Sequence, residues 1–455
     1  MLQRLRRRYG AGRGMNPTRI VAGSFACIIL IGALLLLLPV SAKSGQSVGP
    51  MTALFTATSA TCVTGLILAD TWQTWSLFGQ AVLLLLIQLG GLGFMTVFTL
   101  FSLAMGKRIG LSQRLLMAST LNLTDMDGVV RVVRHALWGT VLFEGAGAVI
   151  LSACFIPELG LGRGLWYGIF HAVSAFCNAG FDLMGESAPF NSLTAYDGHP
   201  AVLFTVMALV TIGGLGFLVW EDLWLHRRWR DLSLYTRIVL VMTALLILAG
   251  TLFFFCVEFG NPATLGPMPL WKKGLNALFQ SVTLRTAGFN TIDQAGLGDT
   301  SVAMSVLLML VGGSSGSTAG GLKTATVAVL LLSVRAGLRG SPEVTLRGRT
   351  VSHGRVMNAV TLVLTAAVLF IAASMALSLA EGLPFLACAY EAASAMGTVG
   401  VTMGLTPGLS FFSRVLLIAL MYTGRVGLLS FSIAFLTKGR DGGRVKYPTF
   451  DIMIG

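Results

Sequence analysis

The chain has 455 residues, of which 55% are hydrophobic and only 11% are charged. Soluble domains carry about 25% charged residues, so this composition excludes an ordinary soluble protein and indicates a membrane protein. The net charge of +13 would suggest a nucleic-acid partner in a soluble protein. Here the basic residues cluster in loops between apolar segments, as in cytoplasmic loops, so no nucleic acid is expected to bind. The six cysteines have no CxxC or metal-ligand spacing, and no disulfide framework is expected.

The first predicted element is an apolar span near 19–40, long enough to cross a bilayer as a helix. Arginines precede it, as in a secretory signal, but the apolar run is longer than in such signals, so an uncleaved span fits better than a cleaved one. The segment 51–60 is too short to span, and a second span follows near 76–105. The first repeat, 19–106, therefore has the order span, short helix, extended stretch, span.

The same order of elements occurs three more times along the chain. We predict an all-α polytopic membrane protein with eight transmembrane helices, in four tandem span–pore helix–span repeats around a pseudo-fourfold central pore. The later repeats cover 135–226, 227–334 and 356–437. Their spans are expected near 135–156, 200–224, 235–258, 301–334, 356–380 and 411–436, and their short helices near 165–176, 270–283 and 384–396.

The distribution of charge predicts the orientation. Most of the 32 Lys and Arg residues lie in the N-terminus, between the repeats and in the tail. Cytoplasmic loops carry an excess of basic residues, so both termini are expected in the cytoplasm and the short helices are expected to enter from outside. The cytoplasmic segments would be 1–18, 107–134, 335–355 and 438–455.

One short stretch occurs once in each repeat and ends each time in glycine. These glycines are separated by 115, 108 and 112 residues, a period that indicates one repeated unit. Backbone carbonyls of an extended strand can replace the water around a cation, and glycine takes the left-handed conformations that such a strand needs. The short helix before each strand would point its negative end at the ion. We interpret the stretches as the walls of one ion filter, because a helix-packing motif explains one copy but not four at equal spacing. The residues are Cys62, Val63, Thr64 and Gly65; Cys177, Asn178, Ala179 and Gly180; Arg285, Thr286, Ala287 and Gly288; and Gly397, Thr398, Val399 and Gly400.

A second glycine follows each stretch at an offset of 25, 33, 24 and 24 residues. The glycine-ending stretch and the second glycine thus occur in the same order four times, which supports a fourfold repeat. These second glycines are Gly90, Gly213, Gly312 and Gly424.

The third repeat contains an unusual Gly-, Ser- and Thr-rich segment inside an apolar span. Each glycine disfavours a helix by about 1 kcal/mol relative to alanine, and irregular hydroxyl-rich backbone should line water. We expect a flexible gating loop across the pore beneath the filter, with a kinked, closely packed span as the alternative. A phosphate-binding loop does not fit, because Lys323 does not directly follow a glycine and no strand precedes the segment. The segment is Gly312, Gly313, Ser314, Ser315, Gly316, Ser317, Thr318, Ala319, Gly320 and Gly321.

Charged residues inside apolar segments are functional-site hypotheses. Arg425 either places positive charge beside the pore or forms a structural tie to carbonyls or to a carboxylate such as Glu144. Arg285 is expected to brace the third stretch from behind, since a cation that lined the filter would repel the ion. Lys323 is expected to snorkel toward the cytoplasm. Glu391 either attracts cations at the outer mouth or acts as an N-terminal acid of the fourth short helix, and the second interpretation is favoured.

These residues resemble the Trk/Ktr/HKT superfamily of potassium transporters. The four stretches match its filter motifs, the segment 312–321 resembles its intramembrane gating loop, and Arg425 matches its last-span arginine. Within the superfamily the chain is most similar to the KtrB group, the membrane subunits of bacterial Ktr systems, since few residues precede the first span. Gly65 points to potassium, because plant members that favour sodium often carry Ser there.

The resemblance implies a channel-like, K⁺-selective translocating subunit of a bacterial uptake system in the inner membrane, and no enzyme activity. It also implies a homodimer on a cytoplasmic ring of nucleotide-binding, KtrA-like subunits, with Na⁺ as an activator and no organic cofactor. No segment is long enough for a soluble nucleotide-binding domain, which separately favours such a partner. The basic tail and loops could bind this partner or anionic membrane lipids.

Three other functions compete with this one. A Trk-type K⁺ or Na⁺-coupled cation symporter of the same superfamily is the main alternative. A secondary transporter of another kind fits less well, because the repeats here are parallel rather than inverted. A membrane enzyme fits less well still, because no catalytic cluster lies within the spans.

Overall fold

The structure, a computed structural model, describes residues 17–93, 129–186, 188–341 and 343–427. These residues are mostly helical, with one small antiparallel hairpin of β1 (Thr345–Leu346) and β2 (Arg349–Thr350). The chain runs four times through a long helix, a short helix, a non-helical strand and a second helix. The predicted all-α repeat is therefore confirmed.

Proline and serine mark where many of these helices begin. Pro50 and Pro200 occupy the first turn of α3 and α10. The backbone N–H that proline lacks would have no partner within the helix at this position. The side chains of Ser76, Ser233 and Ser410 cap α5, α12 and α18 by accepting a backbone N–H. The helices of repeats 1 and 2 are α2 (Pro17–Leu37), η1 (Pro39–Ser41), α3 (Pro50–Thr61), α4 (Thr71–Thr74), α5 (Leu77–Leu92), α8 (Val129–Leu159), α9 (Leu161–Phe176), η2 (Thr194–Tyr196), α10 (Pro200–Leu215) and α11 (Phe217–Leu225). Those of repeats 3 and 4 are α12 (Leu234–Val257), α13 (Leu270–Thr283), α14 (Asp299–Leu310), α15 (Thr324–Leu338), α16 (His353–Glu381), α17 (Phe385–Gly397), η3 (Thr406–Gly408) and α18 (Phe411–Val426).

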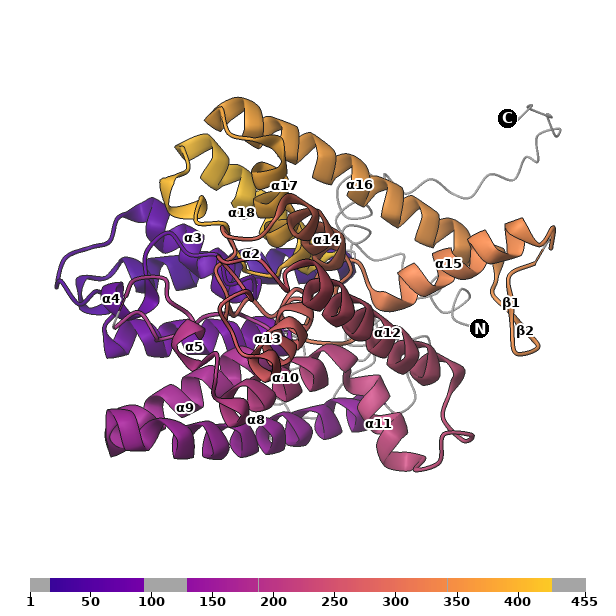
Figure 1. The fold of residues 1–455 in the computed structure, drawn as a ribbon, viewed down its shortest axis with the longest axis horizontal. Helices are drawn as coiled ribbons and strands as arrows, with labels where there is room; N and C mark the ends of the chain where they lie inside the picture. Colours follow the sequence, from indigo (N-terminus) through magenta and orange to yellow (C-terminus); the bar gives the residue numbers. More distant parts are fainter. Residues whose placement is uncertain (1–16, 94–128, 187, 342, 428–455) are drawn as a thin grey trace, which may run out of the picture.

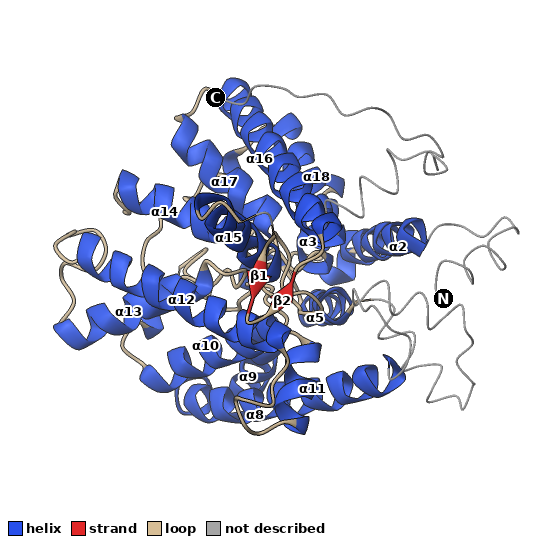
Figure 2. Cartoon of the chain, turned by 90° about the vertical axis from the view of Figure 1, so that its right-hand side faces the viewer, coloured by secondary structure: helices blue, strands red, loops and turns tan. Residues whose placement is uncertain are grey.

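The four repeats are arranged in chain order around a common centre (Figures 1 and 2). Buried apolar clusters join each repeat to the next. One cluster combines repeats 1 and 2 with α13, and another combines repeats 3 and 4. A third joins repeat 4 back to repeat 1, for example through Leu417 and Phe55. The ring of repeats is therefore closed, and its core lies between neighbouring repeats.

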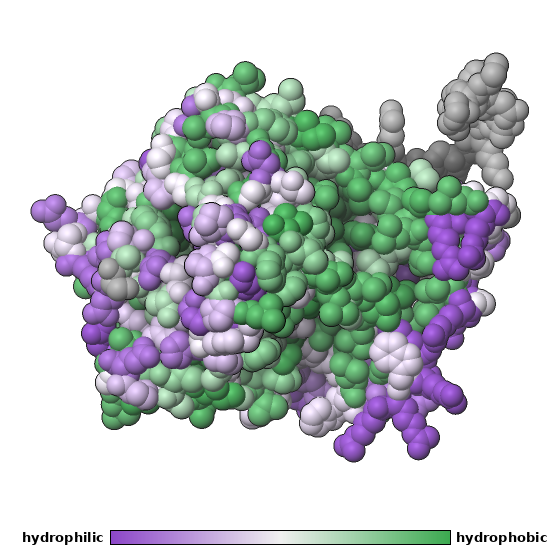
Figure 3. Space-filling view, in the orientation of Figure 1, coloured by the Kyte–Doolittle hydropathy of each residue, from purple (hydrophilic) through white to green (hydrophobic). Residues whose placement is uncertain are grey.

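The long first helices expose apolar side chains on their outer faces. Leu34 in α2 is 66% exposed, Val149 in α8 71%, Leu252 in α12 66% and Val368 in α16 69%. Green apolar residues cover the middle of the molecule, and purple polar residues gather toward its ends (Figure 3). Four helices of the described chain (α2, α8, α12 and α16) are long and apolar enough to cross a membrane, and the bent pair α10–α11 would be a fifth. Such a surface is matched to lipid rather than water.

The second helices are shorter than the first, and they end near glycine. Helix α10 ends at Leu215, and the chain turns by 92° at Gly216 into α11, so the span predicted over 200–224 is not one continuous helix. The cause is local: Gly216 has a φ of +91°, and a β-carbon there would lie 2.7 Å from Ser314 Oγ. The break between α14 and α15 is confirmed. The far ends of the predicted spans 76–105 and 411–436 lie outside the described residues.

Candidate functional site: four converging glycine strands

The four predicted stretches meet at the centre of the ring, and we call them the glycine strands (62–65, 177–180, 285–288 and 397–400). A β-carbon built on the last glycine of each strand would lie at most 2.7 Å from a carbonyl oxygen of the next strand. The four glycines have φ between +68° and +100°, a region that side chains disfavour. These contacts close a ring in the order of the repeats: Gly65 with Ala179, Gly180 with Ala287, Gly288 with Val399, and Gly400 with Thr64.

The strands also share a left-handed residue two positions before the glycine. A positive φ is uncommon for non-glycine residues, yet it recurs here at the same register in all four strands. The residues are Val63 (φ 50°), Asn178 (57°), Thr286 (69°) and Thr398 (53°). The four strands therefore share one backbone conformation and converge around one axis. Their carbonyl oxygens repeat four times around this axis. Carbonyl oxygens are the ligands that replace the hydration shell of a monovalent cation.

A hydroxyl group near the end of each short helix holds the strand that follows. The Ser59 hydroxyl accepts a hydrogen bond from Gly65 N at 3.0 Å, and Ser394 does the same for Gly400 N at 3.0 Å. In the second strand the direction is reversed, and Ser174 Oγ donates to Phe181 O at 2.7 Å. The third repeat follows the second: Thr283 Oγ1 donates to Phe289 O at 2.6 Å. Sequence reasoning missed these residues, although a hydroxyl five or six positions before each glycine was a visible signal.

In three of the four repeats, close packing explains the second glycine, the one that follows the strand by 24 to 33 residues. A β-carbon on Gly90, Gly213 or Gly424 would collide with a backbone carbonyl in the last turn of the short helix of the same repeat. The second helix can therefore pack directly against the start of its own strand. In the third repeat, Gly312 lies against Gly320 O instead, because the chain forms a loop there.

The predicted gating segment is a non-helical loop of residues 311–323, between α14 and α15. It lies against the N-terminal ends of the strands. Thr318 Oγ1 is 3.1 Å from Phe176 O and 3.0 Å from Asn178 Oδ1. A β-carbon on Gly312 would lie 3.3 Å from the Thr286 side chain, and one on Gly320 would collide with Thr398. The loop thus contacts three of the four strands.

Hydrogen bonds tie the same loop to repeat 2, to α12 and to itself. Ser314 N donates to Gly214 O at 3.0 Å, and Phe217 N at the start of α11 donates to Gly316 O at 2.9 Å. Ser317 Oγ donates to Ser314 O at 2.7 Å. Further bonds join Gly312 N to Leu322 O, Thr324 N to Gly313 O, Tyr235 OH to Ser315 O and Thr318 N to Gly213 O. The segment is therefore a hydrogen-bonded, non-helical loop that separates α14 from α15.

Arg425 connects this loop to the first repeat. Its guanidinium donates to Thr318 O in the loop, to Gly90 O, and to Gly91 O at 2.9 Å. Of the two structural partners considered, the contacts favour carbonyls over Glu144. The Glu144 carboxylate instead accepts from Gln88 Nε2 at 3.1 Å. Arg425 is therefore placed to hold the loop against the centre of the ring.

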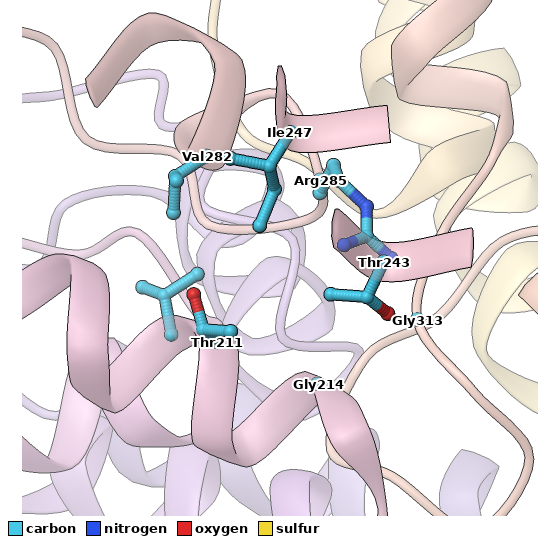
Figure 4. A pocket seen from close by; sticks show the side chains of 8 residues that line it. Thr211, Gly214, Thr243, Ile247, Val282, Arg285 and Gly313 are labelled. Atoms are coloured by element: carbon cyan, nitrogen blue, oxygen red, sulfur yellow. The ribbon is translucent and has the colours of Figure 1, made fainter. Parts of the chain in front are cut away.

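Arg285 points away from the axis, behind the third strand. Its guanidinium lies beside Thr243 and Gly313 in a small buried pocket that Thr211 and Ile247 also line (Figure 4). The side chain is 8% exposed, and its NH2 group is 3.4 Å from Gly312 O. This position agrees with the expectation of a brace and adds a contact with the 311–323 loop.

Two charged residues differ from what the sequence indicated. Lys323 does not simply extend toward solvent, because its Nζ donates to Ala319 O at 2.7 Å within the loop. Glu391 lies in the middle of α17 rather than at its N-terminus, and it is 1% exposed. Its carboxylate accepts from Met403 N at 3.1 Å and from Thr406 Oγ1 at 2.6 Å. It therefore fastens the segment that follows the fourth strand.

A family model described as "Cation transport protein", TrkH, matches residues 12–442. The chain belongs to the TrkH family of cation transport proteins. Membership agrees with the expected superfamily and makes the chain a transport protein rather than an enzyme. The potassium transporter TrkH from Vibrio parahaemolyticus has a similar fold, with a TM-score of 0.74 over 94% of this chain and 86% of that one, at 18% identity.

Relatives within the family match the chain over nearly its whole length. It is 40% identical to the potassium/sodium uptake protein NtpJ of Enterococcus hirae, over 100% of this chain and 99% of the relative. It is 38% identical to the Ktr system potassium uptake protein B of Bacillus subtilis, over 97% of both chains. The Vibrio alginolyticus protein of the same name is 36% identical, over 97% of this chain and 96% of the relative.

The chemistry at the centre of this TrkH-family chain is that of oxygen ligands. The described residues contain no group of three or more His, Cys, Asp or Glu side chains that could hold a metal ion. The oxygens that converge belong to the backbone, and the arginines near them point at other carbonyls. Backbone carbonyl dipoles are ligands that compensate the dehydration of a monovalent cation without neutralising its charge.

Proposed function

We propose that this chain is the K⁺-selective translocating subunit of a bacterial K⁺ uptake system. The glycine strands act as its selectivity filter, with K⁺ bound at the strand carbonyls and passing down its electrochemical gradient. The observation that carries the proposal is the closed ring of glycine–carbonyl contacts from Gly65 through Gly400 to Thr64. The three relatives, two named as potassium uptake proteins and one as a potassium/sodium uptake protein, support K⁺ as the ion.

The 311–323 loop is the proposed gate. It lies against the strands at their N-terminal ends, where it would block an ion that leaves the filter. Arg425 and Arg285 hold it there through hydrogen bonds to Thr318 O and Gly312 O. Lys323 stabilises the loop itself by donating to Ala319 O. Opening would require the bonds of the two arginines to break, so the loop's position can be controlled by whatever moves α18 or α11.

The proposed orientation places the loops between the short helices and second helices outside the cell, with both termini in the cytoplasm. The excess of basic residues in segments 1–18, 107–134, 335–355 and 438–455 supports it. The four repeats would then cover 19–106, 135–226, 227–334 and 356–437. The short helices would enter from outside and place the filter on the external side of the gate.

A cytoplasmic nucleotide-binding subunit, KtrA-like, is the proposed regulatory partner of a homodimer of this chain, and Na⁺ is the proposed activator. Two relatives are named as component B of a Ktr system, which supports a further component. A second candidate function is Na⁺-coupled cation symport, and the likeness to NtpJ, a potassium/sodium uptake protein, favours it.

Uptake by intact cells tests the proposal. The chain is expressed in cells that lack their own K⁺ uptake systems, with and without a co-expressed cytoplasmic nucleotide-binding subunit. We expect K⁺ uptake that increases with the partner and does not require net Na⁺ entry. Stoichiometric Na⁺ entry would support symport instead, and no K⁺ uptake in either condition would contradict both candidates.

A further inference from the structure

The bend between α10 and α11 produces an exposed surface whose composition suits a membrane interface. We call it the α11 elbow: Trp224, Leu225, Arg227, Arg228, Trp229 and Arg230. Trp224 is 79% exposed, Leu225 55% and Trp229 47%. The three arginines are also exposed, and purple side chains project from the corner of the molecule where Figure 1 places α11 and the following loop (Figure 3).

The inner face of α11 is fixed to the protein, so the elbow has a defined position. Phe217 packs in a buried cluster with Val133 of α8. Arg131 Nε donates to the Glu221 carboxylate at 3.1 Å. The loop after α11 is also held, because Asp222 accepts a hydrogen bond from Ser233 N at 2.9 Å. The exposed tryptophans and arginines therefore belong to an ordered surface.

The angle between α10 and α11 orients the elbow parallel to a membrane rather than across it. Helix α11 lies at 92° to α10, so α11 runs in the membrane plane if α10 crosses the bilayer. It packs against α8 and α12, and the exposed apolar faces of these helices continue from it: Trp138 is 70% exposed and Leu245 56%. Interfacial helices combine tryptophan at the headgroup level with basic residues that attract anionic lipid.

We propose that the α11 elbow binds anionic lipid headgroups of the membrane leaflet that it faces, and that this binding changes the preferred position of the 311–323 loop. Among the described residues, none of its three guanidinium groups forms an ion pair. A basic residue near an anionic surface contributes attraction that salt screens. The tryptophans and Leu225 continue the lipid-facing surface, which favours lipid over a water-soluble protein partner.

The elbow begins where the loop is held. Phe217 N, the first amide of α11, donates to Gly316 O at 2.9 Å, and Gly216 packs against Ser314. Tyr235 at the start of α12, just after the elbow, donates to Ser315 O at 3.2 Å. A lipid that holds the elbow at the interface thereby biases the position of the 311–323 loop. This second part rests on the proposed function, because it assumes that the loop gates ion flow.

Two measurements on the full chain test the two parts separately. The first is the affinity of the detergent-solubilised chain for phosphatidylglycerol, measured by titration. The second is K⁺ flux in vesicles of phosphatidylcholine with and without phosphatidylglycerol. The test variant is Arg227→Gln, Arg228→Gln, Arg230→Gln. A matched control with the same change of charge is Arg347→Gln, Arg349→Gln, Arg355→Gln, in exposed residues around the β1–β2 hairpin.

We expect the test variant to bind phosphatidylglycerol at least about tenfold more weakly and to lose the rise in flux that this lipid gives the wild type. The control variant should retain both. Equal losses in the two variants, or unchanged affinity in the test variant, would overturn the proposal. So would a test variant that keeps its lipid response but loses activation by a cytoplasmic partner, since the elbow would then bind protein. If the wild type carries no K⁺ in any vesicle, the proposed function fails, while the titration still decides whether the elbow binds lipid.

Discussion

Arg425 in α18 donates a hydrogen bond from its guanidinium to the backbone carbonyl of Thr318 in the 311–323 loop. The same guanidinium binds Gly91 O in repeat 1 at 2.9 Å. One side chain of the fourth repeat thus joins the loop of the third repeat to the second helix of the first. The relationship connects three repeats across the centre, and it points to control of the loop rather than to recognition of the ion.

Replacing Arg425 tests that control. Arg425→Ala removes the bonds that hold Thr318, and hydrogen bonds from a charged group are worth about 1.5–3 kcal/mol each. We expect K⁺ flux in vesicles to rise several-fold, with little change in the ratio of K⁺ to Na⁺ permeability. Arg425→Lys, which keeps the charge, should have a smaller effect. A changed permeability ratio with unchanged flux would argue against a gating role.

Shortening the loop is a stronger version of the same experiment. Deletion of residues 313–319 removes the contacts with Asn178, Gly214 and Phe217, so the path beneath the strands should stay open. We expect higher flux than in the wild type. Tyr235→Phe, which removes the bond to Ser315 O but leaves the rest of the loop in place, should give a partial increase. Unchanged or lower flux in correctly folded deletion protein would assign the loop a packing role.

The hydroxyls behind the strands should support selectivity. Ser59→Ala leaves the N–H of Gly65 buried without its partner, which costs about 1–3 kcal/mol. We expect a lower Tm and a weaker preference for K⁺ over Na⁺. Ser44→Ala, in an exposed turn, is the control. If Ser59→Ala matches this control in both measurements, the hydroxyl does not position the strand.

Uptake should depend on external pH through Asp182. This carboxyl follows the second strand in the loop after Phe181, and burial, with a smaller contribution from nearby Asp70, raises its pKa to about 7. It is therefore neutral at lower pH and ionised at higher pH, when its charge attracts cations to the proposed entrance. The KM for K⁺ should fall by about two- to threefold as external pH rises through that value.

The matched variant for this experiment is Asp182→Asn, which cannot ionise. Its KM should stay at the value that the wild type shows at low pH and should be independent of pH. A pH profile in Asp182→Asn like that of the wild type would assign the titration to another group.

Much of the fold could be predicted, because membrane length and the glycine repeat constrain it strongly. The short helix predicted over 270–283 is α13, Leu270–Thr283. The four glycines that the sequence repeat singles out are the ones whose contacts with neighbouring carbonyls close the ring. The bend at Gly216 was missed, because the run Gly213-Gly214-Leu215-Gly216 also reads as a close-packing surface for a continuous helix.

Other parts of the site depend on contacts that no local pattern reveals. Glu391 was placed at a helix start, but its partners Met403 and Thr406 follow the fourth strand. Ser59 looks like any small residue in a short helix until Gly65 N is seen beside it. The carbonyl partners of Arg425 come from other repeats, so only the assembled ring distinguishes them from Glu144.

The ion selectivity of Gly65→Ser tests most directly whether the glycine strands form a K⁺ filter. A β-carbon at this position would lie 2.7 Å from Ala179 O, so the substitution must displace a carbonyl of the ring. The control is Gly404→Ser, where φ is also positive (+84°) but no atom lies within 4 Å of the added β-carbon. The measurement is the ratio of K⁺ to Na⁺ flux through the full chain in vesicles. We predict that Gly65→Ser lowers this ratio by about tenfold while Gly404→Ser preserves it; an unchanged ratio in folded, conducting Gly65→Ser protein would contradict the account.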